Sequence, residues 1–188
     1  MNTDVTMTMA DSCEASLGRN GSIGDEVKIN GYYKVQCHDK DGNLKWEDEI
    51  HNLVTTVGKN LALTGTLTNA AQGAVYMGLK GTGTAAVGDT QASHSGWLEV
   101  GATNAPTYTA PRKTVTFATA SGGSITSTGT YQFAMTSSGT VAGCFINING
   151  TSTIDNTTGT LFSAGDFASS KTVTNTDTLT VTYTASIA

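Results

Sequence analysis

The closing stretch of the chain, residues 177–187, constrains the fold more than any other segment. Apolar side chains occupy every second position from Leu179 to Ile187, and threonine or serine fills the positions between them. A strict period of two is typical of a β-strand with one buried face and one solvated face. Such a strand is stable only against partner strands and a second apolar layer. The rest of the chain is therefore expected to supply an antiparallel β-domain.

Other segments carry strand patterns and are separated by turns every 8–12 residues. The predicted strands cover residues 27–37, 44–51, 74–79, 97–100, 112–118, 125–135, 140–147, 161–167 and 171–174. We count about eight or nine strands, with residues 97–100 at a sheet edge and Gly31 marking a bulge or kink. This pattern predicts a mainly β fold, an antiparallel β-sandwich that is either Ig-like or jelly-roll-like.

One short helix is expected after the second strand. Asn52 has the residue type of a helix N-cap, and apolar residues from Leu53 to Leu63 recur at helical spacing. Gly58 weakens this helix by about 1 kcal/mol relative to alanine. The predicted helix covers residues 53–63 and lies across an end or a face of the sheets.

The first 25 residues show little periodicity and form a separate unit in our prediction. They contain three glycines and three scattered methionines. We interpret residues 1–25 as an extended N-terminal arm, ordered only where it lies on a neighbouring surface, or else as a disordered tail. Residues 26–188 then form the β-sandwich domain.

Composition argues against several classes of function. Charged residues are 13% of the chain, against about 25% in an average soluble domain. The net charge of −5 is unfavourable for nucleic-acid binding. No stretch reaches the ~18 apolar residues of a membrane span, and the start of the chain lacks a signal-peptide pattern. We therefore expect a protein that folds in a cytoplasm, with no nucleic-acid or membrane partner.

Three cysteines, Cys13, Cys37 and Cys144, are spaced neither as a disulfide framework nor as a zinc site. We expect free thiols. The three histidines, His38, His51 and His94, also match no metal-binding spacing. No cofactor or metal site is predicted from either set.

The turn at residues 39–43 is the clearest local signal and joins two strands in a hairpin. Its first residues also begin like a calcium-binding loop. That loop requires glycine at its sixth position and glutamate at its twelfth, where the chain has Leu44 and Ile50. A hairpin turn is therefore predicted in preference to a calcium site.

The only acidic cluster, Glu47-Asp48-Glu49, lies on a predicted strand. Successive strand residues face opposite sides, so the three carboxylates cannot converge as an acid–base pair. Glu47 and Glu49 are expected to keep a solvated sheet edge from pairing with other strands. Nucleophile motifs are also lacking, so we predict no catalytic residues and no enzyme activity.

Aromatic residues make up only 7% of the chain, with two tryptophans that could form a carbohydrate-binding platform. Trp46 alternates with Leu44 and is expected in the core. Trp97 is the other candidate, and it follows a loop over residues 81–95.

Two blocks of sequence resemble a known family. They consist of residues 31–48, continuing through His51-Asn52-Leu53-Val54 and Val57-Gly58, and of Tyr76-Met77-Gly78-Leu79, residues 86–90 and residues 92–99. Together with the threonine- and glycine-rich β tail, they are similar to small virion structural proteins of tailed bacteriophages. These are capsid decoration (cement), head-fibre or tail-fibre proteins. The resemblance covers roughly residues 24–188.

The resemblance implies a structural protein of the virion, assembled in the host cytoplasm and released by lysis. It implies no catalytic, cofactor-binding or metal-binding residues. The first expectation is a capsid decoration protein, a dimer or trimer that bridges and stabilises subunits of the major capsid protein. The alternative is a tail or head fibre or adaptor component that contacts host-surface glycans. The expected contact segments are residues 1–25 and the loop over residues 81–97.

Overall fold

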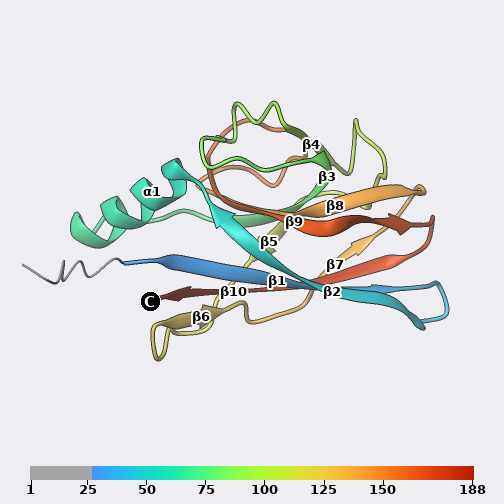
Figure 1. Cartoon of the computed structure of the whole chain (residues 1–188), viewed down its shortest axis with the longest axis horizontal. Helices are drawn as coiled ribbons and strands as arrows, with labels where there is room; N and C mark the ends of the chain where they lie inside the picture. The colour runs from blue at the N-terminus through green and yellow to red at the C-terminus, as the bar shows by residue number, and fades with distance from the viewer. Residues whose placement is uncertain (1–26) are drawn as a thin grey trace, which may run out of the picture.

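The computed structural model describes residues 27–188, so the predicted arm over residues 1–25 lies outside the described residues. The described chain is mainly β, antiparallel, with one short helix (Figure 1). The predicted β-sandwich class is thus confirmed.

The elements follow in chain order. They are β1 (Ile29–His38), β2 (Leu44–Val54), α1 (Thr56–Leu67), β3 (Val75–Gly83), β4 (Trp97–Val100), β5 (Lys113–Val115), β6 (Ser124–Thr126), β7 (Tyr131–Ala134), β8 (Gly139–Ile148), β9 (Thr160–Val173) and β10 (Thr178–Ile187).

Two layers form because β2 leaves one sheet and enters the other. Residues 44–51 of β2 pair with β1, whereas residues 52–54 pair with β9. The strand order is β4-β3-β8-β9-β2-β1-β10-β6, with β5 on β3 and β7 on β10. A strand that changes sheet makes the corner of a sandwich. We call β1, β10, β6, β7 and residues 44–51 the lower sheet, and the remaining strands the upper sheet (Figure 1).

The closing strand β10 has the predicted alternation and lies inside the lower sheet. It pairs with β1 on one side and with β6 and β7 on the other. Leu179, Val181 and Tyr183 are buried in the core, and the threonines between them are half-buried. The pattern weakens at the end of the strand, where Ala185 is half-buried and Ile187 is exposed.

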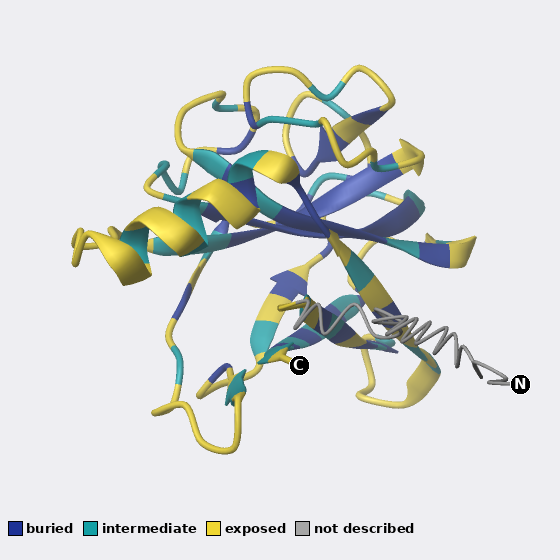
Figure 2. Cartoon of the chain, turned by 60° about the vertical axis from the view of Figure 1, so that its left-hand side comes forward, coloured by how far each residue is buried: buried dark blue, intermediate teal, exposed yellow. Residues whose placement is uncertain are grey.

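The upper sheet is covered on both faces. In β8 every residue from Val141 to Asn147 is buried (Figure 2). Cys144 and Ile146 face the main core, whereas Phe145 packs with Trp97 and Leu161 in a second, smaller cluster. The loops over residues 84–96 and 149–159 form part of this outer cover. Gln91 of the first loop donates a hydrogen bond to Asn156 of the second, and the Trp97 indole donates to Asp89 of the first.

The helix begins three residues later and ends four residues later than predicted. Its N-cap is Thr55, whose Oγ1 accepts a hydrogen bond from the Gly58 amide at 3.0 Å, and α1 covers Thr56–Leu67. Asn52, the predicted cap, is instead strand, because Asn52 to Val54 pair with Gly165 to Ser163. The prediction was wrong because Val54, which fits the helical spacing, also continues the strand alternation from Ile50.

Several strand boundaries also differ from the prediction. The predicted strand over residues 125–135 is divided into β6 and β7 by a bend at Gly129. The two predicted strands over residues 161–167 and 171–174 are replaced by the single strand β9. The predicted strand over residues 112–118 shortens to β5, and residues 81–83 of the predicted loop belong to β3.

Gly31 marks no bulge, because the pairing of β1 with β10 continues through it and the shift against β2 falls at Cys37 and His38. A Cβ at Gly31 would lie 2.8 Å from the Thr184 carbonyl oxygen and from the Tyr183 hydroxyl. The glycine therefore permits a close approach.

Candidate functional site

The two sheets diverge at one end and leave an open apolar cleft of about 160 Å³ between them. Its lining side chains are apolar except for one tyrosine hydroxyl, and they come from both sheets. The upper sheet contributes Val75, Ile146, Ile148 and Phe162, and the lower sheet and its margin contribute Phe117, Ile125, Tyr183 and Ala185. Ile148 and Phe162 also line a hollow of about 230 Å³ beneath α1. The cleft and the hollow therefore adjoin each other at these two side chains.

A groove of about 420 Å³ lies beside this cleft, between the start of β1, the end of β2 and α1. Both ends of the described chain meet here, since Lys28 and Ala188 exchange two backbone hydrogen bonds of 2.8 and 3.0 Å. We call the cleft, the hollow under α1 and this groove together the open end (left in Figure 1).

Large apolar side chains are exposed around the open end. Five of the eight exposed large hydrophobic residues between positions 27 and 188 lie there: Val27, Leu53, Leu63, Leu67 and Ile187. The charged residues that line the three cavities are Lys28 and Lys59. Exposed apolar side chains gathered at one end of a molecule are typical of a site where another protein binds.

A buried polar network closes the inner side of the cleft. The hydroxyl of Tyr33 lies 2.8 Å from Ser163 Oγ, and Asn52 Nδ2 donates to the hydroxyl of Tyr183 at 2.8 Å. The two tyrosine rings are 4.7 Å apart. Burial raises the pKa of Tyr183 to about 12 and raises that of Tyr33 as well. Both phenols are thus neutral and join the sheets through hydrogen bonds.

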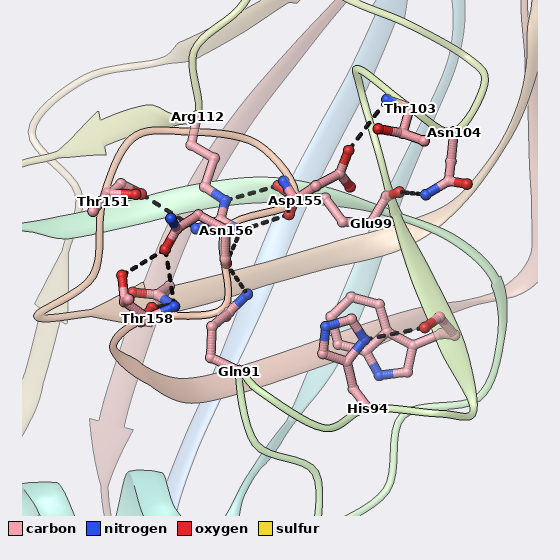
Figure 3. Close-up of polar contacts among 12 residues, drawn as sticks. Gln91, His94, Glu99, Thr103, Asn104, Arg112, Thr151, Asp155, Asn156 and Thr158 are labelled. Carbon is pink, nitrogen blue, oxygen red and sulfur yellow. Dashed lines mark hydrogen bonds and ion pairs between the residues drawn. The ribbon is translucent and has the colours of Figure 1, made fainter.

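The loops on the outer face of the upper sheet are organised by a buried ion pair (Figure 3). Arg112 donates to Glu99 from Nε at 2.8 Å and from Nη2 at 2.5 Å. Its Nη1 and Nη2 also donate to the carbonyl oxygens of Thr151 and Asn156. Burial raises the pKa of Glu99, an effect that Arg112 opposes. One guanidinium therefore fixes the loop over residues 149–159 against β4.

A second buried cation holds the start of the loop over residues 84–96. Lys80, fully buried, lies 2.6 Å from Asp166 Oδ1, and it also donates to the carbonyl oxygen of Gly83. Asp166 Oδ2 accepts from the Ala85 amide at 2.9 Å. Further along, Asp89 accepts from the Trp97 indole at 2.9 Å. This loop, an expected contact segment, is thus attached to the sheet by side chains at several points.

Between these loops lies a polar hollow of about 380 Å³. His94 stacks on Trp97 at its margin, with ring centres 4.1 Å apart and planes inclined by 21°. Asn104 and Asp155 line the hollow from two other loops, and Asp155 accepts from the Thr103 amide at 3.2 Å (Figure 3). The hollow can hold a small polar molecule, because hydrogen-bonding groups and ring surface meet in it.

The residues singled out for metal chemistry do not come together. His38 and His51 lie at opposite ends of the β1–β2 hairpin, and His94 is in a loop of the upper sheet. Asp39 accepts from the amides of Asp41 and Asn43 at 2.9 Å, which confirms a hairpin turn. Across residues 27–188 no cluster of three potential metal ligands occurs.

The acidic cluster and the described thiols lie as expected. Glu47 and Glu49 are exposed on the unpaired edge of β2, and Asp48 on the other face lies 2.7 Å from Lys171. Cys37 and Cys144 are buried and free, whereas Cys13 lies outside the described residues. Burial raises the pKa of Cys37 to about 12, so this thiol is unreactive in the folded protein.

Neither tryptophan forms an exposed platform. Trp46 is half-buried and packs edge-on against Phe167, with ring centres 5.7 Å apart, while Trp97 is buried beneath His94. In the described part of the chain no helix is long and apolar enough to span a bilayer.

Comparison of the chain with known protein families, with curated proteins and with solved structures found no match.

The buried charges Lys80, Glu99 and Arg112 were missed by sequence reasoning. A signal was present, since charge is scarce in this chain and Lys80 and Glu99 each stand in or beside a buried strand pattern. A charged residue at such a position needs a buried partner.

Proposed function

We propose that this chain is a non-enzymatic structural protein of a tailed-bacteriophage virion, a capsid decoration protein that bridges and stabilises subunits of the major capsid protein. The open end carries this proposal, because it gathers exposed apolar side chains that another protein can cover. The sequence resemblance supplies the identity of that partner and of the particle. The chain acts as a dimer or trimer at the boundaries between capsid subunits.

The proposed mechanism is thermodynamic. A protein that binds only the assembled shell stabilises the shell by mass action, without any chemical step. Burial of apolar surface is favourable by about 25 cal/mol per Å² removed from water, from which the entropy cost of association is subtracted. The fixed loops of the upper sheet keep the rest of the molecule rigid while the open end is covered.

Particles assembled without the chain provide the test. The proposal expects them to lose DNA and to melt at a lower temperature than complete particles, and adding back purified protein restores both properties. Equal melting and equal DNA retention in the two preparations would contradict a cementing role.

The polar hollow favours a second candidate, a tail or head fibre or adaptor component that contacts host-surface glycans. The two candidates differ in copy number. A decoration protein is present in hundreds of copies per virion and a fibre component in few, so quantitative staining of purified virions distinguishes them.

A further inference from the structure

We propose that the polar hollow beside Trp97 binds a neutral saccharide of one or two sugar rings. The walls are built before any ligand arrives, because the buried Arg112–Glu99 pair fixes β4 against the loop over residues 149–159. A volume of about 380 Å³ lies at the lower end of the ~300–1,000 Å³ typical of small-molecule sites. That size limits the ligand to a short saccharide.

A sugar has an apolar C–H face and polar hydroxyl groups, and the hollow has lining residues suited to each. Leu98, which lines the hollow, is 59% exposed, and the half-buried ring of His94 is backed by Trp97. These surfaces suit the C–H face of a pyranose ring. The amide of Asn104 and the carboxylate of Asp155 are placed to bond its hydroxyls.

Gln91 gives an independent sign of a ligand. Its side chain lines the hollow and is only 2% exposed. Its Nε2 donates to the carbonyl oxygen of Asn156 at 3.2 Å, but its Oε1 is buried without a partner among the described residues. A buried acceptor left unpaired costs about 1–3 kcal/mol. A ligand hydroxyl would supply the missing donor once the Gln91 amide turns toward the hollow.

The charge of the hollow selects against acidic sugars. Of its two carboxylates, Glu99 is neutralised by Arg112, while Asp155 forms no ion pair with any residue from 27 to 188. Like charges repel, so a uronic acid or a phosphorylated sugar is disfavoured next to Asp155. The proposal therefore specifies neutral hexoses.

Saturation-transfer NMR with two matched pairs of sugars tests the proposal: glucose with glucuronate and galactose with galacturonate. We expect millimolar binding of at least one neutral sugar and binding of its acidic counterpart weaker by about fivefold or more. Asp155→Asn should remove this discrimination. Ser95→Trp, which fills the hollow, should lower affinity by about tenfold or more. Ser170→Trp, on an exposed part of β9, serves as its control.

Absence of saturation transfer to both neutral sugars would overturn the proposal, as would binding that Ser95→Trp leaves unchanged. Equal binding of neutral and acidic sugars to the wild type would overturn the charge argument. The residues of the open end do not line the hollow. Failure here would therefore leave the docking function standing, and failure of docking would leave this site standing.

Discussion

The guanidinium of Arg112 and the carboxylate of Glu99 are joined by two hydrogen bonds of 2.8 and 2.5 Å, with neither side chain more than 3% exposed. Removing two charges from water is unfavourable unless their other hydrogen-bonding positions are also filled. Here they are filled, because Glu99 also accepts from the Asp155 amide and Arg112 donates to two loop carbonyl oxygens. The pair is thus the centre of the outer loop cluster.

Replacing one member of this pair should be more harmful than replacing both. Arg112→Met alone leaves a buried carboxylate, and Glu99→Leu alone leaves a buried guanidinium. Each should lower the free energy of unfolding by about 3–5 kcal/mol. The double variant should lose less than either single variant, as measured by urea unfolding. Additive losses would show that the two residues act independently.

Gly58 and Gly65, both in α1, should respond differently to alanine. Helix propensity favours alanine over glycine by about 1 kcal/mol at each position. At Gly58, however, an added Cβ collides with the backbone carbonyl oxygen of Phe162, so Gly58→Ala should destabilise the protein.

At Gly65 the nearest group to an added Cβ is the flexible end of Gln72, at 2.9 Å, so Gly65→Ala should be neutral or stabilising. Thermal unfolding of the two variants provides the comparison. A rise in melting temperature for Gly58→Ala would mean that the helix does not pack on β9 as described.

Stability should fall in acid through Asp177. Burial acts to raise the pKa of this carboxyl, but hydrogen bonds from Lys45 at 2.5 Å and from the Thr174 amide at 2.8 Å lower the pKa below its ordinary value. A lowered folded-state pKa means that the ionised group stabilises the fold. This stabilisation is complete above about pH 5 and is lost as the pH falls through the folded-state pKa.

The matched variant for this prediction is Asp177→Asn. It should be less stable than the wild type at neutral pH, and the difference should shrink as urea unfolding is repeated at lower pH. A difference independent of pH would show that the ionisation of Asp177 does not contribute.

The layers of the fold were predictable because they depend on local periodicity. The alternation from Leu179 to Tyr183 predicted a half-buried strand, and the turn at Gly42 predicted the hairpin. The helix start was not predictable in this way, since Asn52 and Thr55 are both good N-caps. Only the pairing of residues 52–54 with β9, a contact distant in sequence, selects Thr55.

The candidate surfaces were less accessible to sequence reasoning. The open end depends on where the two sheets diverge, which brings Val27, Leu63 and Ile187 together from distant parts of the chain. The polar hollow depends on the bond between Gln91 and Asn156, 65 residues apart. Periodicity carries no information about such pairs.

The central claim, docking through the open end, predicts that exposed leucines of α1 are required for binding and dispensable for folding. Leu63 and Leu67 are 59% and 78% exposed, so Leu63→Ser with Leu67→Ser should leave thermal unfolding nearly unchanged. Leu44→Ser, at the hairpin turn and 52% exposed, is the control for loss of a surface leucine.

The decisive measurement is co-sedimentation of purified protein with particles assembled without the chain. The wild type and Leu44→Ser are predicted to saturate the particles with the same affinity, and the double variant to bind at least about tenfold more weakly. Binding of the double variant equal to that of the wild type would contradict docking through the open end.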